Sequence, residues 1–454
     1  MHPLIWKITA VAVIGSFMSN LDATIVNVSL SSLAGALHST LNRIQWVTSG
    51  YLLALALMLP LSGWLVDRIG AKALYLWCFV AFTLSSALCG FAWSTGSLIA
   101  FRILQGMSGG LLAPLAQMMI ARAAGRHMAR VMGYATLPIL LGPILGPVLA
   151  GEILQHASWN WLFFLNVPVG VVAIFLAWTF LPNEREETKR RDFDFLGFAL
   201  LSPGLALVLY ALDHVGERLG KALLVLSLIF LVSFIFVAIR KGHRALIDLE
   251  LFNSRVFSVA AGTQFLSNGV MYAGQLLVPY YLIRSCGLSP TGAGWMLAPL
   301  GLGMFFALPL MGFLTERFGI RKVSGGGACL ALIGTVPFVY MSQYGMVAPL
   351  LDASLFVRGA GLGAISVPCV TAAYASIKKD ELPMATTSLN IVQRVGAPSL
   401  TTACATFLAW KLKSEVAIHS FTAAFLLLSL LQALLCVVAF LLPLNLDPAP
   451  KPTQ

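Results

Sequence analysis

The chain alternates long apolar runs with short polar connectors along its whole length. Each run is near 20 residues long, enough for a helix to cross roughly 30 Å of hydrocarbon. The runs must be helices, because an open sheet would leave backbone groups unpaired in lipid. The first run is too long, and lacks the small-residue cleavage site, to be a removable signal peptide. The pattern predicts about fourteen membrane-spanning helices, at residues 8–30, 46–66, 73–93, 98–120, 131–152, 161–181, 195–213, 221–239, 257–283, 291–314, 323–341, 348–374, 386–409 and 421–443.

Composition agrees with this pattern. Of the 454 residues, 58% are apolar and only 10% are charged, whereas a soluble domain carries about 25% charged residues. The connectors are short, so they leave no room for a soluble domain of any size. The predicted fold class is an all-α polytopic membrane protein.

The formal net charge of +11 would suggest a nucleic-acid partner, but the placement of the charges argues against one. If the N-terminus lies inside, one alternate set of connectors holds most of the lysines and arginines. The opposite set holds only Arg43, Arg218, Lys221, Arg284, Lys411 and Lys413. The positive-inside rule then places both termini in the cytoplasm. The expected partners of the basic excess are anionic lipid headgroups of the inner leaflet rather than nucleic acid.

The sequence lacks catalytic, nucleotide-binding and metal-binding motifs. Its GMSGG at 106–110 matches GxSxG by letters only, because it lies inside a predicted apolar span, and it has no HExxH or Walker-type GxxxxGK[ST] segment. Its seven cysteines form no CxxC pair. We therefore expect neither an enzyme nor a cofactor or metal site. Any active transport must draw on an ion gradient, because this chain has no ATP site of its own.

Three short motifs return in the same order in the second half of the chain, which indicates two homologous bundles of six helices. They are FMSN at 17–20 and FLSN at 265–268, GWLVDRIGAK at 63–72 and GFLTERFGIR at 312–321, and RILQGMSGG at 102–110 with a looser RGAGLGA at 358–364. The predicted domains are an N-terminal bundle at 1–182, a linker with two extra spans at 183–240, and a C-terminal bundle with a short cytoplasmic tail at 241–454. Transporters built this way bind their substrate at the midplane between the bundles.

Asp22 is the one acid that we place well inside a predicted span. A carboxylate in hydrocarbon is costly and is kept only with a partner or a function. Arg102, in the fourth span, offers the partner, and a transporter without an ATP site requires ion coupling. We therefore predict that Asp22, together with Arg102, couples transport to protons. A purely structural Asp22–Arg102 pair is the alternative.

The motif residues resemble those of the major facilitator superfamily. Its cytoplasmic loop signature is similar to Gly63-x-x-x-Asp67-Arg68-x-Gly70-x-Lys72, its fourth-span motif to Arg102-x-x-Gln105-Gly106-x-x-Gly109-Gly110, and its antiporter-associated fifth-span motif to Gly142-Pro143-x-x-Gly146-Pro147-x-x-x-Gly151. The segments LDATIVNVSL, WNWLFFLNVPVG, DFLG, ALIDLELF and SLNIVQRVGAPSL resemble the fourteen-spanner drug/proton antiporter branch (EmrB/QacA-like). Ala71, Asn160 and Pro147 depart from the family pattern, which often has a second basic residue, Arg and Gly there.

The loop at 63–72 and its repeat predict a conformational latch between the bundles. Arg68 and Lys72 are placed to pair with acids of the facing bundle, and Asp67 to accept from the N-terminus of a neighbouring helix. Gly70 permits the tight turn of so short a loop. The latch residues are Gly63, Asp67, Arg68, Gly70, Lys72, Gly312, Glu316, Arg317 and Gly319. The alternative is that Arg68 and Lys72 are only positive-inside anchors.

Gly142, Pro143, Gly146, Pro147 and Gly151 remove side chains from one helix face and weaken the helix ladder. We expect another backbone to approach closely there and the helix to flex. Ordinary small-residue packing is the alternative.

Polar, aromatic and soft side chains inside the spans are candidates for a substrate cavity, which needs adaptable apolar walls with few fixed polar groups. The candidates are Asn20, Asn27, Tyr51, Gln117, Gln264, Asn268, Met271, Tyr272, Gln275, Trp295, Arg358, Asn390, Gln393 and Arg394. Taken singly, each is better explained by bonds that hold helices together. Arg358 and Arg394 have no clear intramembrane acid as a partner, so they bind substrate anions or cap carbonyls.

Together these features predict a secondary exporter of amphipathic organic compounds, driven by the proton gradient without a cofactor. Its expected partners are a small-molecule substrate, protons and membrane lipids. We expect a monomer in a cell membrane, by resemblance the inner membrane of a bacterium, and the sequence identifies no adaptor or outer-membrane partner. A dedicated exporter of one metabolite, such as a siderophore or antibiotic, is the nearest alternative. A transport-dead sensor and an intramembrane enzyme are more distant ones, opposed by Asp22 with the repeated loop and by the missing catalytic motifs.

Overall fold

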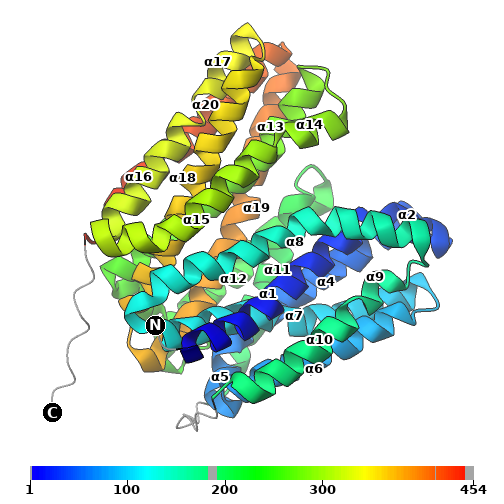
Figure 1. Ribbon diagram of the computed structural model, residues 1–454, viewed down its shortest axis with the longest axis vertical. Coiled ribbons are helices and arrows are strands. Elements are labelled where there is room, and N and C mark those ends of the chain that lie inside the picture. The colour runs from blue at the N-terminus through cyan, green and yellow to red at the C-terminus, as the bar shows by residue number, and fades with distance from the viewer. Residues whose placement is uncertain (1–2, 183–191, 415, 445–454) are drawn as a thin grey trace. The chain divides into compact units, whose positions relative to one another are not determined.

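The computed structural model describes residues 3–182, 192–414 and 416–444. Every regular element in these residues is a helix, and Figure 1 follows the helices from blue near the N-terminus to red near the C-terminus. Twelve helical segments among them are long and apolar enough to cross a membrane. The predicted fold class, an all-α polytopic membrane protein, is confirmed.

The predicted number of spans, about fourteen, is not confirmed, although the two remaining segments exist as helices. α13 (Arg255–Arg284) has 30 residues and α19 (Leu382–Ser414) has 33, and they cover the predicted spans at 257–283 and 386–409. Neither is among the twelve apolar segments. α13 carries three amide side chains, and α19 carries two together with one arginine and two lysines, which makes both helices less apolar.

The chain divides into two compact units. Unit 1 comprises Met1–Gly125, Ala135–Leu249 and Lys379–Asn390. Unit 2 comprises Arg126–Tyr134, Glu250–Lys378 and Ile391–Gln454. α8 (Met128–His156) and α19 therefore each contribute to both units. The predicted domain limits at 182 and 240 remain a prediction, and the linker residues 183–191 lie outside the described part of the chain.

Unit 1 is organised around α7, which packs against α1, α4 and α6, while α10 packs against both α1 and α6 (Figure 1). Ser94 and Ser97 cap the start of α7 with reciprocal bonds, which satisfy N–H groups that have no partner inside the helix. The helices of unit 1 other than α8 and α19 are α1 (Pro3–Val28), α2 (Leu30–Ala36), α3 (Leu41–Ile44), α4 (Trp46–Met58), α5 (Ser62–Ile69), α6 (Ala71–Gly90), α7 (Thr95–Ala124), α9 (Trp161–Phe164), α10 (Asn166–Phe180), α11 (Phe195–Asp213) and α12 (Arg218–Lys241), with 3₁₀ turns at Leu59–Leu61 and Gly242–Arg244.

Unit 2 is organised in the same way around α18, which packs against α13, α15 and α16. Its helices besides α13 and parts of α8 and α19 are α14 (Pro290–Met296), α15 (Ala298–Phe318), α16 (Ile320–Ile333), α17 (Pro337–Tyr344), α18 (Ala348–Ala375) and α20 (Ala417–Phe440). Further 3₁₀ turns lie across the limits of the units, at Gly125–His127 and Leu249–Asn253, and in unit 1 at Lys379–Glu381.

The two copies of the repeated loop have the same backbone. Gly70 ends α5 at φ 83° and ψ 153°, and Gly319 ends α15 at φ 84° and ψ 163°. Residues with a Cβ avoid this conformation, which glycine adopts readily. Each glycine is followed at once by the next helix, so the repeat in the sequence is also a repeat of the chain reversal.

Outward apolar faces agree with a lipid surrounding. On α12, the side chains of Val225, Ile229, Val232, Phe236 and Ile239 are all exposed. A soluble surface rarely exposes so continuous an apolar stripe, whereas hydrocarbon accepts it.

Candidate functional site

α1 and α7 bring Asp22 and Arg102 together in the interior of unit 1. Arg102 Nη1 donates to Asp22 Oδ2 at 2.6 Å, and neither side chain has any exposed surface. Two charges taken out of water are stable together only if their remaining hydrogen-bonding groups also find partners. The surroundings of the pair therefore determine whether it can persist.

Two amide side chains complete the surroundings of the carboxylate. Gln105 Nε2 donates to Asp22 Oδ1 at 3.1 Å, and Asn166 Nδ2 donates to the same oxygen at 2.7 Å. Arg102 Nη1 also donates to Gln105 Oε1 at 2.7 Å. Asp22 thus accepts from three side chains, two on α7 and one at the start of α10.

Aromatic and backbone contacts hold the guanidinium of Arg102 from the other side. It lies over the Tyr51 ring, 4.2 Å from the centroid, and its Nε donates to the Val47 carbonyl at 3.4 Å. Its Nη2 is buried and has no hydrogen-bond partner among the described residues. Tyr51, which we predicted as a cavity residue, is itself buried and supports the ion pair; its hydroxyl lies 2.9 Å from Ser19 Oγ.

The glycines of the fourth-span motif explain why Arg102 reaches this position. A Cβ on Gly106 would come within 2.3 Å of the Tyr51 carbonyl oxygen, and one on Gly110 within 2.5 Å of the Leu55 carbonyl oxygen. Any side chain at either position would force α7 away from α4. The glycines therefore set the close contact that places Arg102 against α4 and beside Asp22.

Asn166 and Ser86 belong to the site, although no role was predicted for them. Besides its bond to Asp22, Asn166 Nδ2 donates to Ser86 Oγ at 3.1 Å, and Ser86 Oγ donates to the Phe163 carbonyl at 3.0 Å. Asn166 stands in the family-like segment WNWLFFLNVPVG. The sequence feature that could have pointed to Asn166 is a single amide in the apolar run of this span. That feature does not show which residue the amide contacts.

The first copy of the latch loop lies at the junction of α5 and α6. Lys72 Nζ donates to the Leu181 carbonyl at 2.7 Å, at the end of α10. Arg68 is exposed and lies over the Trp64 ring at 5.4 Å from its centroid, and Asp67 is half-buried. The pairing of Arg68 and Lys72 with acids of the facing bundle remains a prediction.

Gly63, the first residue of the latch loop, faces the start of α19 within unit 1. A Cβ on Gly63 would lie 3.2 Å from both the Pro383 carbonyl oxygen and Thr387 Oγ1. The neighbouring Ser62 Oγ lies 2.6 Å from Thr387 Oγ1. The loop is therefore held against α19 by a hydroxyl pair as well as by close packing.

The second copy of the latch loop contains an ion pair inside unit 2. Glu316 accepts from Arg130 Nη2 in a short bond and lies 3.5 Å from His127 Nδ1. Gly312 permits this contact, because a Cβ there would come within 2.3 Å of Arg130 Cα. Arg317 is exposed beside the Phe318 ring.

The fifth-span motif brings α8 close to α1 beside Asp22. A Cβ on Gly142 would lie 3.3 Å from the Leu21 nitrogen, and one on Gly146 would lie 2.7 Å from Thr24 Cγ2. Gly151, in contrast, has no such neighbour within 4 Å. The close approach is therefore confined to the first half of the motif.

The two prolines of this motif do not interrupt the helix, since α8 runs from Met128 to His156 through both positions. Pro147 is exposed, and the side chain of Pro143 lies outside the described part of the structure.

Family comparison identifies the architecture. The model of the Major Facilitator Superfamily matches residues 12–274 and 260–454, which together span nearly the whole chain. The chain belongs to the major facilitator superfamily. It is therefore a multi-pass membrane transporter and not an enzyme.

Relatives of this major facilitator are named as multidrug resistance proteins. It is 32% identical over 398 residues to the multidrug resistance protein B homolog of Mycobacterium tuberculosis, which covers 86% of this chain and 74% of the relative. It is 36% identical over 329 residues to the putative multidrug resistance protein MdtD of Escherichia coli, which covers 70% of this chain and 68% of the relative.

Solved structures support the fold alone, because their sequence identity is low. The proton:xylose symporter XylE matches with a TM-score of 0.66 and 16% identity over 95% of this chain and 94% of that one. The human organic anion transporter MFSD10 matches with a TM-score of 0.64 and 17% identity over 95% of this chain and all of that one, 100%.

The predicted cavity residues of this major facilitator differ in burial. Those buried are Tyr51, Gln264, Arg358 and Asn390; those half-buried are Gln117, Asn268, Met271, Gln393 and Arg394; those exposed are Asn20, Asn27, Tyr272, Gln275 and Trp295. In unit 1, Asn390 Nδ2 donates to Gln117 Oε1 at 3.0 Å. In unit 2, Gln264 Nε2 donates to the Ser366 carbonyl at 3.0 Å. These bonds join helices within each unit, and a role of these residues in a substrate cavity stays a prediction.

Arg358 is the buried cation of unit 2 among the described residues. Its Nη2 donates to the Val270 carbonyl at 2.8 Å, and its Nε is buried without a partner among the described residues. Two roles were left open for Arg358, binding a substrate anion and capping a backbone carbonyl. The structure contains the bond to a carbonyl.

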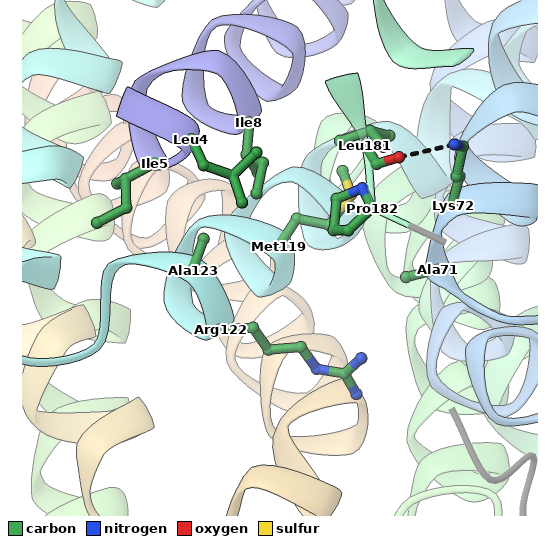
Figure 2. A pocket seen from close by; sticks show the side chains of 10 residues that line it. All are labelled: Leu4, Ile5, Ile8, Ala71, Lys72, Met119, Arg122, Ala123, Leu181 and Pro182. Atoms are coloured by element: carbon green, nitrogen blue, oxygen red, sulfur yellow. Dashed lines mark hydrogen bonds between the residues drawn. The ribbon is translucent and has the colours of Figure 1, made fainter. Parts of the chain in front are cut away.

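A pocket of about 300 Å³ lies at the end of unit 1 where α1 begins. Figure 2 shows the side chains that line it. Its walls are mostly apolar, with two basic side chains, and are formed by Leu4, Ile5, Ile8, Ala71, Lys72, Met119, Arg122, Ala123, Leu181 and Pro182. None of the predicted cavity residues lines it. Lys72 turns its ammonium group toward the Leu181 carbonyl (Figure 2).

One imidazole and one carboxylate approach each other after α12. His243 Nδ1 lies 2.6 Å from Asp248 Oδ2. The two side chains form a hydrogen-bonded pair in the connector that follows α12.

Proposed function

We propose that this transporter is a secondary exporter that exchanges protons for amphipathic organic compounds, drugs among them. The observation that carries the proposal is the Asp22–Arg102 pair, which is enclosed in unit 1 on two membrane-spanning helices. A carboxylate in that position is a site for a transported or coupling ion. The names of the multidrug resistance relatives support the substrate class.

The pair supplies a simple coupling step. A proton bound by Asp22 removes the negative charge, which weakens the attraction of Arg102 and frees α1 to move against α7. Release of the proton on the other side restores the pair. The driving force is about 2.3 kcal/mol per charge for each 100 mV of membrane potential, and about 1.4 kcal/mol for each unit of pH difference.

The fifth-span motif and the repeated latch loop are placed to carry a movement of α1 to other helices. α8 packs closely on α1 through Gly142 and Gly146, so a shift of α1 at Asp22 displaces α8 as well. α8 begins at the Arg130–Glu316 ion pair of unit 2. We propose that the latch loop and its repeat stabilise one state of the transport cycle, and that proton binding at Asp22 favours the other.

The test uses purified protein in proteoliposomes that contain a pH indicator. Addition of substrate to wild type should move protons, and a pH gradient should drive accumulation of several chemically unrelated compounds. Asp22→Asn keeps the size of the side chain but binds no proton, so both signals should be lost while folding is retained. Glu152→Gln, at an exposed acid of α8, removes the same charge and should behave as wild type.

Full gradient-driven transport by well-folded Asp22→Asn protein would assign Asp22 a structural role. Transport of a single compound from the panel would favour a dedicated metabolite exporter.

A further inference from the structure

Asp22 is surrounded by hydrogen-bond donors. Its Oδ2 accepts from Arg102, and its Oδ1 accepts from Gln105 and from Asn166. An ionised carboxylate only accepts, whereas a neutral carboxyl group also carries an O–H that requires an acceptor. This arrangement therefore fits the ionised form, and a proton on Asp22 requires a neighbour to present an oxygen instead of an N–H.

Two of the three neighbours are poorly suited to do so. Arg102 has five donors and no acceptor. The Oε1 atom of Gln105 already accepts from Arg102 at 2.7 Å and lies 3.7 Å from Cys89 Sγ. Rotation of the Gln105 amide would turn its NH₂ group toward the guanidinium and break that bond.

Asn166 is suited to the change. Its Nδ2 uses its two protons for Asp22 Oδ1 and Ser86 Oγ, at 2.7 and 3.1 Å. Rotation of the amide by half a turn exchanges Nδ2 for Oδ1 at that position, and an amide oxygen has two lone pairs. Ser86 Oγ accepts from Asn166 and gives its single proton to the Phe163 carbonyl, so it can donate to a rotated Asn166 Oδ1 only by giving up the Phe163 bond.

We propose that Asn166 is a positioning residue that reads the protonation state of Asp22 by rotating its amide, an inference that rests on the proposed proton coupling. With Asp22 ionised, the Asn166 N–H donates to Asp22 Oδ1. With Asp22 neutral, the new O–H donates to Asn166 Oδ1, and the N–H bond at that oxygen is lost. The N–H bonds of Asn166 to Asp22 and Ser86 are both lost, Asn166 Oδ1 accepts from Asp22 and can accept from Ser86 in their place, and the proton on Asp22 is the only one added.

The consequence is a path from α1 to two other helices. Asn166 opens α10, Ser86 lies in α6, and Ser86 in turn donates to the Phe163 carbonyl in α9. α10 packs against both α1 and α6. A change of orientation at Asn166 therefore alters contacts on α6, α9 and α10 without movement of the Arg102 side chain.

Few other titratable groups face Asp22, so a rotation of the Asn166 amide would follow the protonation of Asp22 rather than that of another group. Arg102 faces it from α7, Tyr51 from α4 through its contact with Arg102, and Cys89 from α6. The sequences of α2, α9 and α10 contain no Asp, Glu, Lys, Arg or His. α8 approaches α1 with glycines, and its carboxylate Glu152 is exposed.

The test is infrared difference spectroscopy of the purified protein during a pH titration. The band of the neutral Asp22 carboxyl is assigned by its loss in Asp22→Asn. In wild type with ¹³C-labelled asparagine, an asparagine carbonyl band should shift at the same pH as the Asp22 band appears. The shift should be absent in Asn166→Leu and retained in Asn160→Ala. This control removes the hydrogen bond that the Asn160 side-chain amide donates to the Gly90 carbonyl.

Ser86→Ala provides a second test, in which Asn166 itself is not substituted. Loss of the hydroxyl removes the acceptor of one Asn166 amide proton from the orientation that serves ionised Asp22, so the asparagine band should lie nearer its low-pH position already before Asp22 is protonated. A merely structural Ser86–Asn166 contact would lower thermal stability and leave the pH-dependent shift of the asparagine band unchanged.

The inference is overturned if Asp22 does not titrate, if no asparagine band follows its titration, or if the band persists in Asn166→Leu. Substrate-driven proton release is measured separately. If the two bands titrate together while substrate releases no protons, the role of Asn166 stands and the proposed antiport fails.

Discussion

Arg358 Nη2 donates to the carbonyl oxygen of Val270 at 2.8 Å, at a position where the first half of the chain has an acid. Val270 follows the repeated FLSN motif by two residues, as Asp22 follows FMSN by two residues. Both halves thus keep a buried arginine on the central helix, but only the first half keeps the carboxylate. The two arginines are therefore chemically different sites despite the repeat.

Replacement of each arginine by leucine should separate these two situations. Arg102→Leu leaves the Asp22 carboxylate buried without its cation, which should cost about 3–5 kcal/mol of stability. Arg358→Leu removes a charge that has no carboxylate partner among the described residues, and should change stability by only about 1 kcal/mol or increase it. Thermal unfolding in detergent measures both. Equal losses in the two variants would contradict this distinction.

The contact between α8 and α1 is tested by two glycine substitutions on the same helix. Gly146→Leu would force a side chain into Thr24, whereas the Cβ of Gly151→Leu would meet no neighbour within 4 Å. Overpacking typically costs about 1–3 kcal/mol. We expect Gly146→Leu to lower the melting temperature and transport, and Gly151→Leu to resemble wild type. A melting temperature of Gly146→Leu equal to that of Gly151→Leu would rule out the close contact.

The latch is tested at Asp67. Asp67→Asn should fold normally, because the residue is only half-buried, but should shift the balance of transport states and reduce transport. Spin labels on the two units report the state by their distance distribution. Asp192→Asn removes the same charge from an exposed connector residue and serves as the control. Distances and transport rates of Asp67→Asn that match the control would refute the latch.

Asp194 should give a pH-dependent contribution to stability. Burial opposes ionisation of its carboxyl, but the hydrogen bonds from Lys241 Nζ and from the Gly197 and Leu246 backbone nitrogens outweigh burial and lower its pKa below 3.8. A lowered pKa in the folded state stabilises the fold above the ordinary pKa, and the contribution disappears as pH falls below it.

Asp194→Asn should therefore be less stable than wild type at neutral pH, by about 1–3 kcal/mol. The difference should shrink once the pH falls below 3.8, the ordinary pKa of this carboxyl. Melting temperatures of both proteins across this pH range measure it. A difference that is independent of pH would show that the Asp194 charge plays no part.

Orientation in the membrane is tested by cysteine labelling in a cysteine-free background. From the positive-inside pattern we expect a cysteine at Glu217 to react with an impermeant reagent outside, and one at Arg244 only after the membrane is opened. A tag on the C-terminus should lie inside. An external C-terminus would require an odd number of spans and would contradict two bundles of six with two extra helices.

Much of the fold could be predicted because its causes are local. Apolar run length determines which segments cross a membrane, and the Gly70 and Gly319 motifs repeat because each reversal needs glycine at its own position. The number of spans was less secure, since α13 and α19 carry polar residues that weaken the apolar signal.

The sequence by itself determined the helical membrane class, the repeat, the family and the cost of a carboxylate at Asp22. Only the tertiary structure decided which groups meet that carboxylate. Asn166, far along the chain, reaches Asp22 because α10 packs against α1, and Arg102 reaches it because Gly106 lets α7 approach α4. Hydrogen-bond partners across helices depend on the rotation and depth of each helix, which are set by such contacts between distant segments and not by local sequence.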